Sequence, residues 1–351
     1  MKRDKQAKTT SLLAATAMTF LLCFASCAKS GPGNGSRVTL ILGAYTTPRE
    51  AYSKAIIPSF KQVWKSNSGQ DVEFQASYQG SGSQVRAIIG GFEADVAALS
   101  LSEDIDKIQQ AGLIHHDWKS KPHGGMATRS IVVIAVRPGN PKGIKDWPDL
   151  AKPGLNILTP DPKTSGGAMW NINAIYGAAL RGHAGVAANN AAAAEQFLKS
   201  VFKNVTVMDK GARESITNFE RGVGDAAITY ENEVLVGQAA GQKYEYIVPR
   251  STILIENPVA LVDQYVDKHG TRKAADEFLN YLWSKEAQRA FTKFGLRPVD
   301  PDVEGEAVSQ FRAVEDLWKI DYLGGWKKVI SDIFGPQGVY SRMHQELHQS
   351  K

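Results

Sequence analysis

Strand-like and helix-like segments alternate along residues 38–293, and this alternation constrains the fold more than any other feature of the sequence. Apolar runs such as Val38–Leu42 and Ile131–Val136 are typical of strands that are buried on both faces. Between such runs, apolar residues recur at helical spacing, as in Pro48–Lys65 and Arg272–Lys293, which we expect to be helices. The alternation predicts an α/β fold with mixed, mostly parallel sheets.

The length of the chain and the number of predicted strands indicate two lobes. The chain has 351 residues, whereas a typical domain has roughly 150. We expect the chain to cross between the lobes near Thr128–Ser130 and again near Tyr230–Asn232. In a two-lobed α/β protein, the cleft between the lobes is the expected ligand site. The expected parts are lobe 1 (residues 37–127 with 231–300), lobe 2 (residues 128–230) and a C-terminal helical segment that packs on the lobes (residues 301–351).

Residues 1–26 have the layout of an export signal. A basic stretch precedes an apolar run over residues 12–24, which is short for a membrane span and has the length found in signal peptides. Two small residues and then Cys27 follow, an order that resembles a lipoprotein signal and predicts lipid attachment at Cys27. Ordinary secretion with cleavage nearby is the alternative. The Gly/Pro/Ser-rich residues 27–36 are expected to form a flexible tether.

The charge and the cysteines of the chain belong largely to this leader. Residues 1–26 carry four positive charges and one negative charge, so their removal lowers the net charge from +5 to +2 and argues against a nucleic-acid partner. Both cysteines, Cys23 and Cys27, lie at the leader, which excludes an internal disulfide or a cysteine metal site in the mature domain. We expect an exported monomer in the periplasm or on the extracytoplasmic face of the membrane, without a metal or a cofactor.

Three predicted strand-to-helix junctions carry small residues where a helix begins: G-S-G-S at 80–83, T-S-G-G at 164–167 and G-A-R at 211–213. The first N–H groups of a helix have no intrahelical partner and lie at the positive end of the helix dipole. Glycine lets a ligand approach the backbone closely, and serine adds a hydroxyl donor. A single junction of this kind usually reflects plain helix capping. Three of them together predict an anion site.

Whether the bound anion carries a proton distinguishes sulfate from phosphate as the ligand. Sulfate is fully ionised at neutral pH and only accepts hydrogen bonds, whereas monohydrogen phosphate can also donate one and gains from a carboxylate acceptor. The acidic residues nearest to the junctions in the sequence are Asp161 and Glu214, and neither lies among the glycine and serine residues of its junction. This favours sulfate, although an acid from elsewhere in the chain could reach the cleft. Arg129 and Arg213 could pair with the anion or be solvated.

Several segments, in the same order, carry a resemblance to a known family. They include Y-Q-G-S-G-S-Q (78–84), R-P-G-N-P-K-G-I-K-D-W-P-D-L (137–150), T-P-D-P-K-T-S-G-G-A (159–168), F-K-N-V-T-V-M-D-K-G-A-R (202–213) and G-V-G-D-A-A-I-T-Y-E-N-E (222–233). Over nearly all of residues 37–340 the chain resembles the bacterial periplasmic sulfate-binding proteins of ABC importers. The resemblance implies a type II periplasmic-binding-protein fold, in which two lobes joined by a hinge close on sulfate. It also implies that the protein binds sulfate without a salt bridge and that ABC permease subunits are its partners.

The resemblance also implies which residues contact the ligand. Two of these positions depart from the family, because Thr46 stands where the family has Asp and Tyr230 stands where it has Trp. The backbone N–H at Thr46 survives the change, but the phenol of Tyr230 can accept as well as donate. Thiosulfate or another tetrahedral oxyanion, such as phosphate or molybdate, is therefore an alternative ligand. The implied contacts are Thr46, Ser81, Ser165, Gly166, Gly167, Ala212 and Tyr230.

An exported enzyme is the competing class of function. Ser81, Ser83 and Ser165 could be nucleophiles, but no G-x-S-x-G elbow surrounds them. The run His115-His116-Asp117 could bind a metal, but adjacent side chains rarely share one metal site, and a polar turn at the end of a helix is the simpler interpretation. The sequence therefore favours a binding protein over an enzyme.

Overall fold

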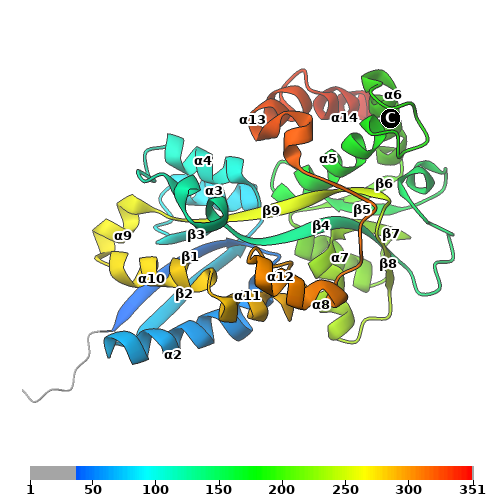
Figure 1. Cartoon of the computed structure of the whole chain (residues 1–351). Helices are drawn as coiled ribbons and strands as arrows, with labels where there is room; N and C mark the ends of the chain where they lie inside the picture. Colours follow the sequence, from blue (N-terminus) through cyan, green and yellow to red (C-terminus); the bar gives the residue numbers. More distant parts are fainter. Residues whose placement is uncertain (1–36, 350–351) are drawn as a thin grey trace, which may run out of the picture. The chain divides into compact units, whose positions relative to one another are not determined.

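The computed structural model describes residues 37–349. The predicted signal segment, Cys27 and the predicted tether lie outside the described residues. The described part contains one continuous path of paired strands, β2-β1-β3-β9-β4-β7-β5-β6, flanked by helices (Figure 1). It is a mixed α/β fold with mostly parallel pairing, as the alternation predicted.

A first group of elements is built from residues 38–110. Strand β1 (Val38–Tyr45) pairs in parallel with β2 (Val72–Gln79) and with β3 (Val96–Ala98). Because parallel strands need crossover connections, helices lie between them. These helices are α1 (Arg49–Ala51), α2 (Ile57–Ser68), α3 (Ser81–Ile89) and α4 (Ser102–Gln110). A π-helical turn over Tyr52–Ile56 joins α1 to α2, where the sequence predicted one continuous helix over Pro48–Lys65.

A second group of elements follows the same construction. Strand β5 (Ile157–Pro160) pairs in parallel with β6 (Val205–Asp209) and with β7 (Ala226–Tyr230). Its helices are α5 (Gly166–Leu180), α6 (Ala191–Phe202), α7 (Ala212–Glu220) and α8 (Glu231–Ala239). In both groups, the carboxyl ends of the strands lead into helix N-termini, which positions the three junctions.

Two long strands, β4 (Met126–Val136) and β9 (Ser251–Leu261), connect the groups. They pair with each other in antiparallel fashion from Met126–Pro258 to Ile131–Leu254. Beyond this shared stretch, β9 pairs with β3 of the first group, and β4 pairs with β7 of the second. Figure 1 shows the two strands running side by side between the groups. The described chain therefore passes between the groups along β4 and along β9.

The second crossing lies later in the chain than we expected. Strand β8 (Glu245–Ile247) pairs with β4, and α8 contacts β4 and β7, so residues 231–247 lie with the second group. The sequence obscured β9 because Glu256, Asn257 and Pro258 interrupt its apolar pattern. Pro258 lacks an N–H and is placed at the register shift opposite Met126, where a strand tolerates proline.

The helix predicted over Arg272–Lys293 is two helices, and that prediction was wrong. After α9 (Asp263–His269), helix α10 (Arg272–Leu282) ends, and α11 (Lys285–Thr292) begins after Ser284. The Ser284 hydroxyl accepts from the Ala287 N–H at 3.2 Å, a side-chain cap that starts a new helix. Apolar spacing alone does not reveal this break, because both helices bury apolar residues in the same core cluster.

The C-terminal residues pack on both groups and include a strand that we did not predict. After α12 (Pro301–Ala307), strand β10 (Asp316–Trp318) pairs in parallel with β9. The Trp318 ring lies against Gly177 of α5 and leaves no room for a Cβ there. Helix α13 (Gly325–Val329) places the Trp326 ring 4.6 Å from the Trp170 ring, and α14 (Val339–Gln349) contacts α6.

Candidate functional site

The three predicted junctions are helix N-termini that no side chain caps. Helix α3 begins at Ser81 after β2, α5 begins at Gly166 after β5, and α7 begins at Ala212 after β6. Within residues 37–349, none of the three has a side chain that accepts from its first turn, although Ser165 stands at the capping position of α5. The N–H groups at the very start of these helices, those of Ser81, Gly166 and Ala212, are therefore left to bind an acceptor from outside the chain.

The first junction touches both of the others. A Cβ on Gly80 would lie 2.5 Å from the Thr164 carbonyl oxygen and 2.7 Å from the Lys210 carbonyl oxygen. The Ser83 N–H also donates to the Thr164 carbonyl at 3.3 Å. Because Gly80 belongs to the first group and the other two residues to the second, this contact closes the groups on each other. Only glycine fits at position 80 in this arrangement.

The remaining predicted contacts meet at the same place. A Cβ on Gly167 would lie 2.8 Å from Tyr230 Cε2, 3.3 Å from Ser165 Oγ and 3.4 Å from Ala212 Cβ. A Cβ on Gly211 would lie 3.3 Å from Thr46 Oγ1. The fold thus gathers the residues that the sequence singled out, from both groups, around three helix N-termini. Their contacts with a ligand stay a prediction.

Two of the predicted serines play different roles. The Ser165 hydroxyl makes no hydrogen bond in the described chain, so its proton is available to a ligand. The Ser81 hydroxyl instead donates to Asp104 Oδ2 at 2.6 Å and accepts from the Ser100 N–H at 3.0 Å. We expected a serine hydroxyl donor at this junction as well, but that proton is already used. Only the backbone N–H of Ser81 remains for an anion.

Sequence reasoning missed two buried polar residues beside the site, Ser100 and Asp104. Ser100 Oγ lies 2.7 Å from the Tyr230 hydroxyl oxygen, and a Cβ on Gly166 would lie 2.6 Å from Ser100 Oγ. Asp104 is the acid from elsewhere that could reach the cleft, but Ser81 and Lys107 both bind its oxygens. A polar residue just after the short buried strand β3 was the one signal that could have pointed to Ser100.

Arg213 has carboxylate partners and is not free to pair with an anion. Its Nη2 lies 2.9 Å from Glu50 Oε2 and 2.9 Å from Glu233 Oε2, the latter an ion pair without hydrogen-bond geometry. Burial raises the pKa of Glu233 to about 7, although Arg213 opposes the shift. Arg129, the other candidate cation, lies 3.4 Å from Glu304. Both of the arginines that the sequence singled out therefore already have carboxylate partners.

A cavity of about 350 Å³ opens beside the first two junctions, between α3, α4 and the start of α5. Arg86, Lys107 and Lys163 line it together with apolar side chains. Arg86 donates to the Lys163 carbonyl at 3.0 Å and to Ser83 Oγ at 3.1 Å, and Lys107 pairs with Asp104. Positive charge at such an opening favours the approach of an anion.

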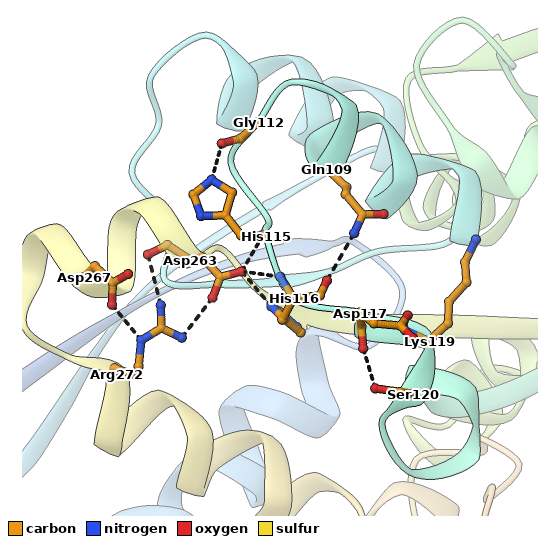
Figure 2. A network of polar contacts seen from close by, with 10 residues as sticks. All are labelled: Gln109, Gly112, His115, His116, Asp117, Lys119, Ser120, Asp263, Asp267 and Arg272. Carbon is orange, nitrogen blue, oxygen red and sulfur yellow. Dashed lines mark hydrogen bonds and ion pairs between the residues drawn. The ribbon is translucent and has the colours of Figure 1, made fainter.

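The run His115-His116-Asp117 forms a polar turn. Figure 2 shows the two histidine rings turned to different partners: His115 Nε2 lies 2.7 Å from the Gly112 carbonyl oxygen, whereas His116 Nδ1 lies 2.6 Å from Asp263 Oδ2. Asp263 also binds the Arg272 guanidinium at 2.9 Å. Across the described residues, no group of three His, Cys, Asp or Glu is arranged to hold a metal ion. This network fixes a loop to helices α9 and α10.

Among the described helices, none is long and apolar enough to cross a membrane.

Comparisons with known proteins identify relatives over nearly the whole chain. A family model described as "Bacterial extracellular solute-binding protein" matches residues 40–297. The "Sulfate-binding protein" of Synechococcus elongatus is 42% identical over 339 residues, covering 96% of this chain and 95% of the relative. The "Thiosulfate-binding protein" of Escherichia coli is 35% identical over 317 residues, covering 89% of this chain and 92% of the relative.

A solved structure agrees with these sequence matches. The sulfate-binding protein SubI from Mycobacterium tuberculosis superimposes with a TM-score of 0.76 at 34% identity, covering 83% of this chain and 98% of that chain. The expected architecture is therefore confirmed.

Proposed function

We propose that this chain, which belongs to the bacterial extracellular solute-binding proteins, binds sulfate between its two groups of elements and presents it to an ABC importer. The observation that carries the proposal is the meeting of three uncapped helix N-termini, at Ser81, Gly166 and Ala212, with the unpaired hydroxyl of Ser165 beside them. This family binds solutes and does not transform them, so the chain is a binding protein and not an enzyme.

Neutral dipoles would hold the anion. The backbone N–H groups of Thr46, Ser81, Gly166, Gly167 and Ala212 would donate, together with the hydroxyls of Ser165 and Tyr230. Each of these hydrogen bonds to a charged acceptor is stronger in a closed, water-poor site than in water. Because Arg213 already pairs with Glu50 and Glu233, we expect that it would not form a salt bridge with the bound dianion.

Identity to the relatives supports sulfate as the ligand. The sulfate-binding relative from Synechococcus elongatus is 42% identical to this chain, against 35% for the thiosulfate-binding relative from Escherichia coli. Thiosulfate is the second candidate, because it is also a tetrahedral dianion that only accepts hydrogen bonds. Phosphate and molybdate fit the same dipoles and serve as competitors in the test below.

Opening and closing would use the two connecting strands. We place the hinge in β4 and β9, because the two strands pair with each other while β9 also pairs with β3 of the first group and β4 also pairs with β7 of the second. Lobe 1 would then hold β1–β3 with α9–α12, and lobe 2 would hold β5–β8, including residues 231–247. We further propose that the mature chain is a monomer, exported and attached to the membrane through a lipid on Cys27, and that permease subunits receive it.

Calorimetry on the purified protein, dialysed against buffer free of oxyanions, tests the proposal. Sulfate should bind with saturable heat, and thiosulfate, phosphate and molybdate should compete more weakly. Ser165→Ala removes one hydroxyl donor and should weaken sulfate binding by about 0.5–1.5 kcal/mol, about 2- to 10-fold. Ser200→Ala on α6, whose hydroxyl bonds the Gln196 carbonyl away from the site, is the matched control. Unchanged sulfate affinity in Ser165→Ala would contradict the site, and stronger binding of thiosulfate would change the ligand.

A further inference from the structure

Arg86 in α3 lies where the two groups of elements meet. Its Nη1 donates to the Lys163 carbonyl oxygen of the second group at 3.0 Å, and its Nη2 donates to Ser83 Oγ at 3.1 Å. No carboxylate among residues 37–349 pairs with this exposed guanidinium. Arg86 differs in this from Arg129 and Arg213, which both have carboxylate partners.

The cavity beside the first two junctions is formed by both groups. Arg86, Asp104 and Lys107 line it from the first group, and Lys163 and Gly166 line it from the second. Its volume of about 350 Å³ falls within the range of small-molecule sites, about 300–1,000 Å³. Gly166 is the first residue of α5, and its N–H is a proposed sulfate contact. The cavity therefore adjoins the proposed sulfate site, called the inner site below, at Gly166.

The cavity lining carries more positive than negative charge. Three of the lining residues are cationic, and Asp104 is the one anionic residue among them. The Ser81 hydroxyl donates to Asp104 at 2.6 Å, and Lys107 pairs with it at 3.2 Å. Lys163 is exposed, and its ammonium group has no ion-pair partner in the described part of the chain. Two cations without carboxylate partners at one opening attract a dianion there.

The hydrogen bond from Arg86 to the Lys163 carbonyl joins the two groups, so it can form only when they are together. In an open arrangement, Arg86 Nη1 would lack this acceptor and would be available to an oxyanion in the cavity. On closure the carbonyl oxygen accepts from Nη1 instead. The guanidinium then keeps a hydrogen bond when the anion moves to the neutral donors of the inner site, so the transfer leaves no donor unpaired.

We propose that this cavity is an outer anion site, in which Arg86 captures the incoming dianion, Lys107 and Lys163 add to the attraction, and closure transfers the anion to the inner site. The inference rests on the proposed sulfate binding and adds a capture step to it. Guanidinium and ammonium groups only donate hydrogen bonds, so the outer site would recognise the charge of an oxyanion.

Stopped-flow fluorescence of the purified protein with sulfate tests the inference. Trp170 should report closure, because its Nε1 donates to the Ser100 carbonyl of the first group at 3.0 Å. Arg86→Met should lower the association rate about threefold at an ionic strength of about 0.01 M, and the difference should vanish near 1 M, where charges are screened within about 3 Å. The dissociation rate should rise about two- to fivefold, because a bond between the groups is lost. Calorimetry gives the dissociation constant of each variant independently.

Two further variants separate capture of the anion from stabilisation of the closed arrangement. Arg86→Lys keeps the charge, so its association rate should stay close to that of the unaltered protein. Lys163→Gln removes a charge but keeps the backbone carbonyl, so only the association rate should fall. Lys243→Gln is the matched control, because Lys243 is exposed and lies between α8 and β8, outside the cavity lining.

The outcomes distinguish this inference from the proposed function. Equal association rates at low salt in Arg86→Met and Lys243→Gln, with sulfate still bound, would overturn the outer site alone. An Arg86→Lys protein that associates as slowly as Arg86→Met would also overturn it, because charge would then not be what captures the anion. Absence of sulfate binding by the unaltered protein would overturn the proposed function, and this inference with it.

Discussion

Arg213 Nη2 in α7 lies 2.9 Å from Glu50 Oε2 in α1, and this ion pair joins the two groups of elements directly beside the predicted anion site. Arg213 follows Ala212, a predicted ligand contact, and its Nη2 also reaches the Thr47 carbonyl oxygen, next to Thr46. Only about a fifth of either side chain is exposed. The pair can form only when the groups are together, so it stabilises the closed arrangement relative to an open one.

Glu50→Gln should therefore weaken sulfate binding without touching the ligand. The variant loses the charge that draws α1 to α7, while Arg213 keeps Glu233 as a partner. We expect a loss of about 1 kcal/mol, about fivefold in dissociation constant, typical of a partly exposed ion pair. Calorimetry measures it, and Glu304→Gln, which removes the exposed partner of Arg129, is the control. Equal affinity in the two variants would show that the Glu50 pair does not favour closure.

Gly80→Ala should block closure by steric conflict. Gly80 has φ −55° and ψ 139°, values that alanine adopts readily, so the open protein should fold normally. In the closed arrangement the new methyl group would lie 2.5 and 2.7 Å from two carbonyl oxygens of the second group. Overpacking of this kind costs about 1–3 kcal/mol, and sulfate affinity should fall accordingly.

The control for Gly80→Ala is Gly305→Ala on α12, where an added Cβ meets nothing within 4 Å. Thermal unfolding of Gly80→Ala without ligand should match that of the unaltered protein, and Gly305→Ala should unfold at the same or a slightly higher temperature, because alanine favours a helix interior over glycine. Sulfate binding should be impaired in Gly80→Ala only. A Gly80→Ala protein that binds sulfate normally would mean that the contact between Gly80 and Thr164 is not part of the ligand-bound state.

The positions that the sequence identified are those whose chemistry is local. Gly80, Ser165 and Gly166 stand at strand-to-helix junctions, where the need for small residues and free N–H groups can be deduced from a few neighbours in the chain. The strands were found for the same reason. Ile131–Val136 alternates between two buried faces, and an uninterrupted apolar run is how such a strand appears in a sequence.

The partners that the sequence did not identify, such as Ser100 for Tyr230 and Glu50 for Arg213, depend on contacts between distant segments. Ser100 and Tyr230 are 130 residues apart, and Glu50 and Arg213 are 163 residues apart, so no spacing rule links them. The later crossing was missed because Pro258 and its polar neighbours hide β9, and only its pairing with β3 and β4 defines it. The use of the Ser81 proton by Asp104 likewise depends on how α3 packs against α4.

His269 should make the first group less stable as the pH rises. Burial lowers the pKa of His269, but hydrogen bonds to Asp95 at 2.9 Å and Glu93 at 3.0 Å raise it overall. The stabilisation is then fully present below the unfolded pKa of about 6.5 and is lost as the pH rises through the folded value. His269→Gln should reduce the free energy of unfolding by about 0.5–1 kcal/mol at pH 5.5 and by less at pH 8.5.

Urea unfolding at the two pH values measures this difference. Glu93→Gln removes one of the two carboxylates that face the ring and should abolish part of the same pH dependence. A His269→Gln protein whose deficit is the same at pH 5.5 and pH 8.5 would show that the charge of His269 contributes nothing to stability.

Asp263 should dominate the acid sensitivity of the loop over residues 112–120. Burial raises the pKa of Asp263, but hydrogen bonds from the backbone N–H of His115, from His116 and from Arg272 lower it well below its usual range. Its stabilisation is thus present above the unfolded pKa of about 3.9 and is lost as the pH falls towards the folded value. In Figure 2, Oδ2 of Asp263 in α9 accepts from the loop while Oδ1 accepts from Arg272 in α10, so this one carboxylate holds the loop to both helices.

Asp263→Asn should therefore cost about 2–3 kcal/mol at pH 7, because hydrogen bonds to a buried charge are lost and Arg272 loses its better-buried partner. The deficit should shrink at pH 3, where the unaltered protein has itself lost part of the stabilisation. Asp267→Asn, which removes the exposed partner of the same Arg272, should cost less at both pH values. Urea unfolding with circular dichroism measures all three proteins. An Asp263→Asn deficit that is no larger than that of Asp267→Asn would mean that the buried carboxylate does not stabilise the loop, because the exposed ion pair with Arg272 would then account for the whole effect.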